Sequence, residues 1–202
     1  IRNRQLYFGL GANYQINNNS FIGASLNFNR MLNRAVSNMA TTIYKDDALT
    51  EESASDITKP GNISLASSNV YYMGKIGIVD INFNTDWLWD KDFSKVNTLE
   101  RYQEHGGDWQ DNAVHTKTNT KNELFASKLI LSLPLCKGRL SFGGEYSNTD
   151  RNSSYDVQPT GLLDRQDNRI KEGMASMFCD YTRKFGQLSV LAGIRYENTD
   201  FN

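Results

Sequence analysis

The sequence predicts an all-β fold: an antiparallel meander of about eight long strands that is part of a transmembrane β-barrel, or a small barrel of its own. Two observations support this prediction. Apolar and polar residues alternate with period two along most of the chain, as in strands, whose successive side chains point to opposite faces. Short turns also alternate with long polar connections, and the apolar half of every strand lies beside a short turn.

The hairpin at residues 173–197 shows the alternation most clearly. Two strands flank a tight turn expected at 184–187, and their apolar residues fall on one face. We expect this face to look outward to lipid, with Tyr196 at a membrane interface and Arg195 on the inner face. The expected outward side chains are Ala175, Met177, Tyr181, Leu188, Val190, Ala192 and Ile194.

The other strands follow the same pattern along the chain. Asparagines tolerate the left-handed backbone of a turn, which favours a turn at 17–20. Clusters of Asp, Glu and Ser without an apolar face favour long loops. The expected strands are 6–14, 22–44, 63–73, 76–102, 113–135 and 140–156, with short turns at 17–20, 74–75 and 136–138 and long loops at 45–61, 103–112 and 157–166.

Composition excludes several classes of protein. The mean hydropathy is -0.57 and no apolar run approaches the ~18 residues of a membrane helix. A net charge of -1 argues against nucleic acid as a partner, because nucleic-acid binding needs a clustered basic excess. A barrel tolerates polar averages, since only alternate residues face lipid. We therefore expect residues 1–202 to be a single β-barrel segment without a plug domain.

The position of the turns favours a membrane barrel over a soluble β domain. Outer-membrane barrels have short periplasmic turns and long external loops, whereas a soluble sandwich has no reason to sort its turns by length. With the short turns in the periplasm, both chain ends lie outside, unlike those of natural barrels. Several strands are also about twice the ~9–11 residues that span a membrane. We expect an excerpt of a larger barrel; a small self-contained β-barrel or β-sheet ligand-binding module is the alternative.

Two stretches resemble a known family. Residues 142–156 and 168–199 are similar to the barrel region of TonB-dependent outer-membrane receptors, within the outer-membrane β-barrel family. The family's Gly-Leu-Arg-x-Glu-x-Thr strand corresponds here to 193–199, with Ile194 in place of Leu. The resemblance implies a Gram-negative outer-membrane receptor that takes up a scarce ligand, such as an iron chelate, cobalamin or a glycan. Its implied partners are outer-membrane lipid, the ligand, and an energising inner-membrane complex that acts through a plug absent from these residues.

Candidate site residues are few. Tyr102, His105 and Trp109 lie in or beside the loop expected at 103–112 and could bind a ligand at the external mouth, although loop packing is the commoner role of such residues. No spacing of ligands indicates a metal, and no motif indicates a cofactor or a catalytic residue, so we expect no enzyme. Arg195, Glu197 and Glu145 share the predicted inner face, where paired charges are usual in a barrel.

Overall fold

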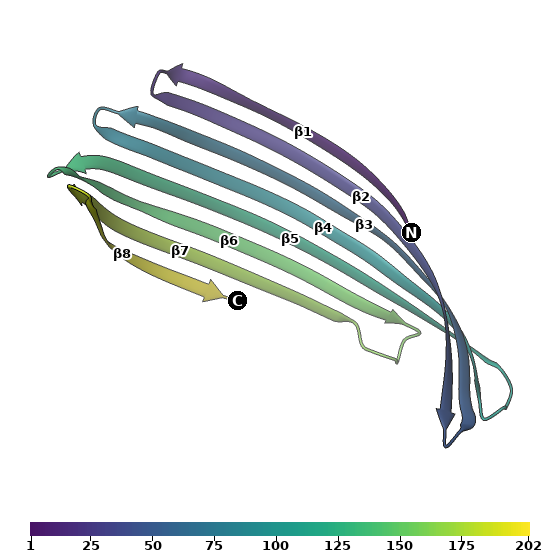
Figure 1. The fold of residues 1–202 in the computed structure, drawn as a ribbon. Coiled ribbons are helices and arrows are strands. Elements are labelled where there is room, and N and C mark those ends of the chain that lie inside the picture. Colours follow the sequence, from purple (N-terminus) through teal and green to yellow (C-terminus); the bar gives the residue numbers. More distant parts are fainter.

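The structure, a computed structural model that describes residues 1–202, is one antiparallel sheet of eight strands in chain order. Each strand pairs with its neighbours in sequence, and β1 and β8 each keep one edge free, so the sheet is curved but open (Figure 1). The predicted eight-stranded meander is confirmed. The strands are β1 (Arg2–Asn17), β2 (Ser20–Lys45), β3 (Ala48–Ile76), β4 (Val79–Glu104), β5 (Gln110–Leu135), β6 (Gly138–Gln158), β7 (Gln166–Phe185) and β8 (Leu188–Phe201).

Four two-residue turns gather at one end of the sheet, as predicted (Figure 1). Cys136 and Lys137 both have positive φ, 47° and 62°, which is the requirement of a type I′ hairpin turn. Asn19 N donates to Asn17 Oδ1 at 2.8 Å, so the asparagine side chain closes the first turn locally. The turn expected at 74–75 lies instead at Gly77 and Ile78.

The loop expected at 45–61 is wrong. Strand β2 continues to Lys45, and β3 begins at Ala48 after a tight turn at Asp46 and Asp47, whose φ values are 50° and 63°. The polar residues on both sides of this turn pair with one another along the sheet. Outside lipid a strand needs no apolar face, because the backbone ladder and cross-strand pairs stabilise it in water.

The other two loops are shorter than expected but present. The second occupies 105–109 rather than 103–112, because β4 and β5 extend into it, and the third occupies 159–165 rather than 157–166. One of the three connections at this end is therefore as short as the turns at the other. The two ends of the sheet differ mainly because β2 to β5 are longer than the other strands and extend further at the end opposite the short turns.

The strand register sorts side chains into two faces. Directly paired residues of antiparallel strands point to the same side, so the outward face can be followed from strand to strand. It is apolar near the short turns on every strand, as predicted, and the other face is polar. The outward apolar band includes Leu10, Leu26, Val70, Phe83, Leu129, Phe142, Met177 and Ile194.

The upper limit of this band crosses the strands obliquely. Leu6 on β1 and Tyr196 on β8 are the last apolar residues before the outward face becomes polar. The pairs followed from Tyr196 lead to Tyr14, eight residues along β1 from Leu6. An offset of about 26 Å along the strands over about 34 Å across them gives a tilt of about 38°. Strands of membrane barrels tilt by ~35–45°.

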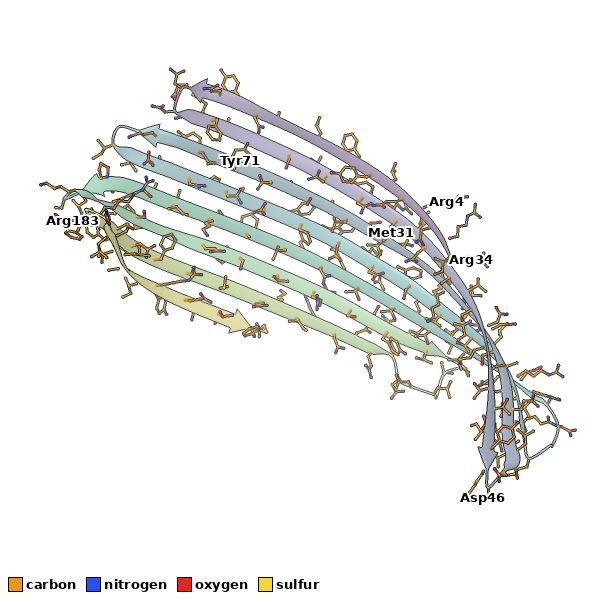
Figure 2. All side chains as sticks on the ribbon, in the orientation of Figure 1. Arg4, Met31, Arg34, Asp46, Tyr71 and Arg183 are labelled. Carbon is orange, nitrogen blue, oxygen red and sulfur yellow. The ribbon has the colours of Figure 1, made fainter.

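The sheet has no interior core. Only 7 of 202 residues are buried, and Val157 is the one buried hydrophobic residue. Outward residues such as Leu10 and Ile194 are 66% and 75% exposed, so the apolar band lacks a second protein layer. Figure 2 shows side chains leaving both faces of this single layer. No helix of the structure has the length and apolar character needed to cross a membrane.

Candidate functional site

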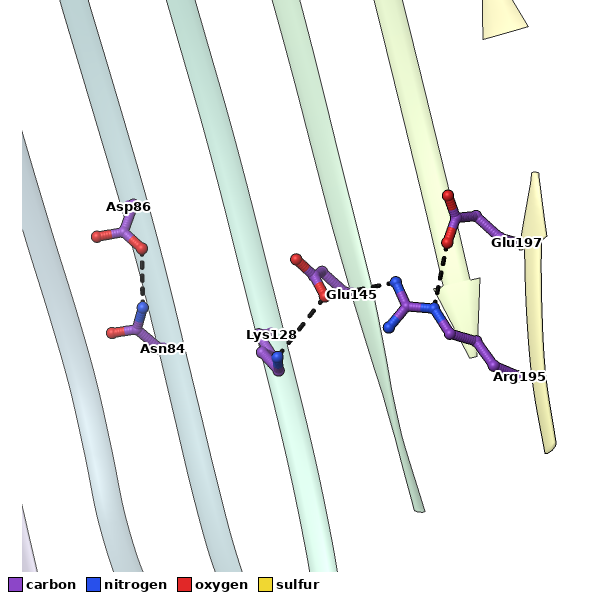
Figure 3. Close-up of polar contacts among 6 residues, drawn as sticks. All are labelled: Asn84, Asp86, Lys128, Glu145, Arg195 and Glu197. Atoms are coloured by element: carbon purple, nitrogen blue, oxygen red, sulfur yellow. Dashed lines mark hydrogen bonds and ion pairs between the residues drawn. The ribbon is translucent and has the colours of Figure 1, made fainter. Parts of the chain in front are cut away.

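A chain of charges runs across the polar face from β5 to β8 (Figure 3). Glu145 on β6 lies between Lys128 Nζ, 3.7 Å from its Oε2, and Arg195 Nη2, 3.9 Å from the same oxygen. Arg195 Nε donates to Glu197 Oε2 at 3.1 Å. The predicted sharing of one face by Glu145, Arg195 and Glu197 is confirmed. Lys128 was not predicted, although its pairing with Glu145 follows from the register.

A second polar cluster lies on the same face between β3 and β4. The amide of Asn69 donates to Asn84 Oδ1 at 2.8 Å and to Asp86 Oδ1 at 2.7 Å. Asn84 donates in turn to Asp86 Oδ2 at 2.8 Å, a contact drawn in Figure 3. Each side chain has its partner within the sheet, so the cluster holds these groups in fixed positions. This face presents charges and amides to water.

One hydroxyl beneath the charge chain has no partner. Ser176 on β7 pairs in the register with Glu145 on one side and Glu197 on the other. It is 3% exposed, and its Oγ makes no hydrogen bond. The two carboxylates instead take their donors from Lys128 and Arg195. The polar face therefore keeps unused hydrogen-bonding capacity beside its charges.

A hollow of about 720 Å³ lies at the opposite end from the short turns. Four strands line it, β2 to β5, and most of its side chains belong to the outward face of the register. Arg101 at its rim contacts Asp111, with 3.8 Å between Nε and Oδ1. The lining residues include Asn38, Ala54, Asp56, Leu99 and Ala113. Small and apolar side chains with polar rims make this hollow suited to an amphipathic ligand group.

The structure does not bring the three predicted ligand-binding residues together. Tyr102 leaves the inner face of β4 and its hydroxyl donates to Gln110 Oε1 at 2.7 Å. Trp109 lies under the Arg101 guanidinium, 5.4 Å from the ring centroid. Arg101 and Tyr102 are neighbours in one strand and so point to opposite faces. Trp109 and Tyr102 are thereby separated.

His105 helps to fix the loop between β4 and β5 through its backbone. Its backbone N donates to Thr50 O at 2.8 Å, and its φ is 48°. A ligand-binding role for Tyr102, His105 and Trp109 stays a prediction. The residues that sequence reasoning missed are Arg101 and Asp111, and the only signal that points to them is the pairing of their strands.

Comparisons with known proteins connect this architecture to a family. The model of the outer membrane protein beta-barrel family matches residues 75–202. No curated protein matches the chain. Among solved structures, the ferric preacinetobactin receptor BauA from Acinetobacter baumannii is similar at 9% identity and a TM-score of 0.42, over 89% of this chain and 30% of that one.

Two further solved structures are similar to the same degree. The ferric-catecholate import receptor Fiu from E. coli K12 has 10% identity and a TM-score of 0.48, over 98% of this chain and 41% of that one. The ferric citrate transporter FecA has 9% identity and a TM-score of 0.41, over 90% of this chain and 27% of that one. This chain thus spans less than half the length of each of these proteins.

The family match covers well over half of the 202 residues and includes β4 to β8. These strands carry the outward apolar band and the charge chain of the polar face. The predicted location in the outer membrane and the predicted resemblance agree with this match. The chain belongs to the outer membrane protein beta-barrel family.

Proposed function

We propose that this chain is part of the barrel wall of a TonB-dependent receptor that imports a scarce ligand across the outer membrane. The height of the strands supports this proposal most directly. Strand β3 has 29 residues, and β2, β4 and β5 have 26 each. At ~3.3 Å per residue β3 is about 95 Å long, although ~9–11 residues are enough to span the membrane. Tall external walls of this kind suit large barrels that receive ligands outside the cell.

The free edges of β1 and β8 support a wall segment of a larger barrel. Neither strand pairs on its outer side. Exposed edges present unpaired N–H and C=O groups, which a membrane barrel satisfies by closing. In this proposal further strands of the whole protein pair with both edges. A plug domain elsewhere in the protein then fills the lumen and transmits energy from the inner membrane.

The polar face supports the role of a lumen wall. Charges and amides held by cross-strand partners line it from β3 to β8, whereas the opposite face carries the apolar band. A ligand route needs fixed polar groups in contact with water, whereas a surface in contact with lipid needs apolar side chains. The ligand classes included in this proposal are iron chelates, cobalamin and glycans.

Uptake by intact cells tests the proposal. A strain that expresses the full-length protein, and its deletion strain, receive radiolabelled ferric citrate, cyanocobalamin or maltohexaose at limiting concentration. We expect uptake of one probe to require the gene and to stop when a protonophore collapses the inner-membrane potential. Uptake that depends on the gene but persists with the protonophore would contradict energised transport and favour an open pore.

The binding-module alternative has its own readout in purified protein. A self-contained module encoded by these residues and a signal sequence alone would form a closed barrel without further strands. The mass of the mature protein in outer membranes therefore separates the alternatives. A mature protein of about the mass of this segment, 22.9 kDa, would overturn the proposal of a larger barrel.

A further inference from the structure

We propose that the outward face just beyond the apolar band binds phosphorylated headgroups of outer-leaflet lipids. We call this surface the cationic belt. The inference rests on the proposed orientation, with the short turns in the periplasm. The belt comprises Arg2, Arg4, Arg30, Arg34, Lys91, Lys95, Lys117, Lys121, Arg169 and Lys171.

The register places these cations on neighbouring strands beyond the apolar band. The pairs that start at Arg30 on β2 pass through Lys91 and Lys121 and reach Arg169 on β7. Four residues further along the strands, Arg2 pairs with Arg34 on β2. Because the strands are tilted, the belt lies directly above the apolar band at Arg4 and Arg30 and further above it towards β7. Figure 2 shows Arg4 and Arg34 near each other beside the N-terminal edge.

Lysines face lysines in the centre of the belt. Lys91 pairs directly with Lys121, and Lys95 pairs with Lys117. Directly opposite residues have Cβ atoms ~4.5–5.5 Å apart, and like charges in such pairs destabilise a sheet. None of the four lysines has an ion-pair partner within the protein, and all four are exposed. An anion between the two lysines of a pair removes their repulsion.

An aromatic ring lies among these lysines. The ammonium groups of Lys95 and Lys117 lie 5.7 Å and 5.8 Å from the centroid of Phe93. Trp87 and Trp89 stand on the same face of β4, closer to the short turns. Aromatic side chains mark the membrane interface in barrels, and long cationic side chains at this depth reach the headgroups. Lys91, the next outward residue of β4 after Trp89, is therefore at the level of lipid phosphates.

Few acids neutralise the belt. Asp150 takes two hydrogen bonds from Arg169, at 2.6 Å and 3.1 Å, which lower the pKa of its carboxyl group; Lys171 and Lys121 act in the same direction. Glu123 accepts a bond from Trp87 Nε1 at 3.3 Å. Neither acid pairs with the central lysines. These lysines are left to an external anion.

The surroundings favour a lipid over a soluble anion. The belt adjoins the apolar band, so a molecule with both acyl chains and a phosphate contacts both surfaces at once. A free phosphate contacts only the lysines. On β4 the sign of the charge follows the face, because Asp90 and Asp92, on either side of Lys91, point to the inner face.

Lipid titration of the full-length protein in mild detergent, followed by native mass spectrometry, tests the proposal. The probes are phosphatidylglycerol, zwitterionic phosphatidylcholine and inorganic phosphate. We expect Lys91→Gln with Lys121→Gln to bind phosphatidylglycerol about 25-fold more weakly, since each lysine near an anionic lipid surface contributes about fivefold. Phosphatidylcholine binding should not change, and Lys91→Arg with Lys121→Arg should bind phosphatidylglycerol like the wild type.

A matched control removes the same charge elsewhere. Lys137→Gln with Lys184→Gln neutralises two exposed lysines at the short-turn end and should leave the affinity unchanged. An equal loss in this control, or no loss in the belt variant, would refute the proposal. Inorganic phosphate that binds as tightly as phosphatidylglycerol would refute the lipid as the source. Lys95→Gln with Lys117→Gln supplies a second pair if the first variant does not fold.

Discussion

Replacing Leu129 with arginine tests the assignment of the two faces. The outward apolar side chains of β5 run from Phe125 to Leu135, so Leu129 lies within about 3 Å of the centre of this band along the strand. An arginine on the lipid face at the midplane costs about 2–4 kcal/mol. We expect Leu129→Arg to lower the folding equilibrium constant by about 30- to 900-fold.

The next residue provides the control. Ile130 is also aliphatic and has the same depth, but it points to the polar face, where its paired residues are Asn82 and Gly143. Ile130→Arg should cost less than about 1 kcal/mol, because its guanidinium remains in water. Guanidinium titration of the full-length protein in lipid vesicles, followed by tryptophan fluorescence, measures both variants. Equal costs, or a larger cost for Ile130→Arg, would refute the assignment.

Three further predictions concern single contacts. Glu145→Gln should lower unfolding free energy by less than about 1 kcal/mol, because its two cationic partners are half exposed, and denaturant titration measures this change. Gly143→Ala should weaken the pairing of β5 and β6, seen as faster amide exchange there, because the new methyl group meets the backbone oxygen of Leu129. The lowered pKa of Asp150 stabilises the fold above its unfolded pKa of ~3.9 and ceases to do so as pH falls through the lower folded value; Asp150→Asn should remove this acid dependence in pH titration by NMR.

The apolar faces were predictable because the strand period is two and lipid favours apolar side chains at the outward positions. The position of the turn between β3 and β4 was not predictable. Gly74 and Gly77 are both candidates by composition, but a Cβ at Gly74 would meet the Tyr72 hydroxyl at 2.5 Å, whereas Gly77 lies in open space with a φ of +60°. Gly74 thus accommodates a neighbouring ring in the sheet, and Gly77 makes the turn. Only the cross-strand register separates the two roles.

The polar stretch at 45–61 was mistaken for a loop for a related reason. An alternating composition reveals a strand only when one face is apolar, and these residues are mostly polar on both faces although they form a strand. The arrangement of the candidate ligand residues was also not predictable from composition, and their ligand-binding role stays a prediction. Tyr102 and Trp109 are close in sequence, but the alternation of β4 sends Tyr102 and the Trp109 partner Arg101 to opposite sides. Tyr102 was expected at the end of a strand, but Trp109 and Gln110 were expected in the loop at 103–112, so the pairing of Tyr102 with Gln110 was not predictable.

The charges of β4 show how one strand serves two environments. Asp90 and Asp92 point to the inner face, and Lys91 between them points outward, where it meets Lys121. The net charge of -1 for the whole chain hides this separation. If the charges served solubility alone, their sign would not need to follow the alternation of the strand. In the proposed barrel, water lies on the inner side of β4 and lipid phosphates on the outer side, which accounts for the separation of Asp90 and Asp92 from Lys91.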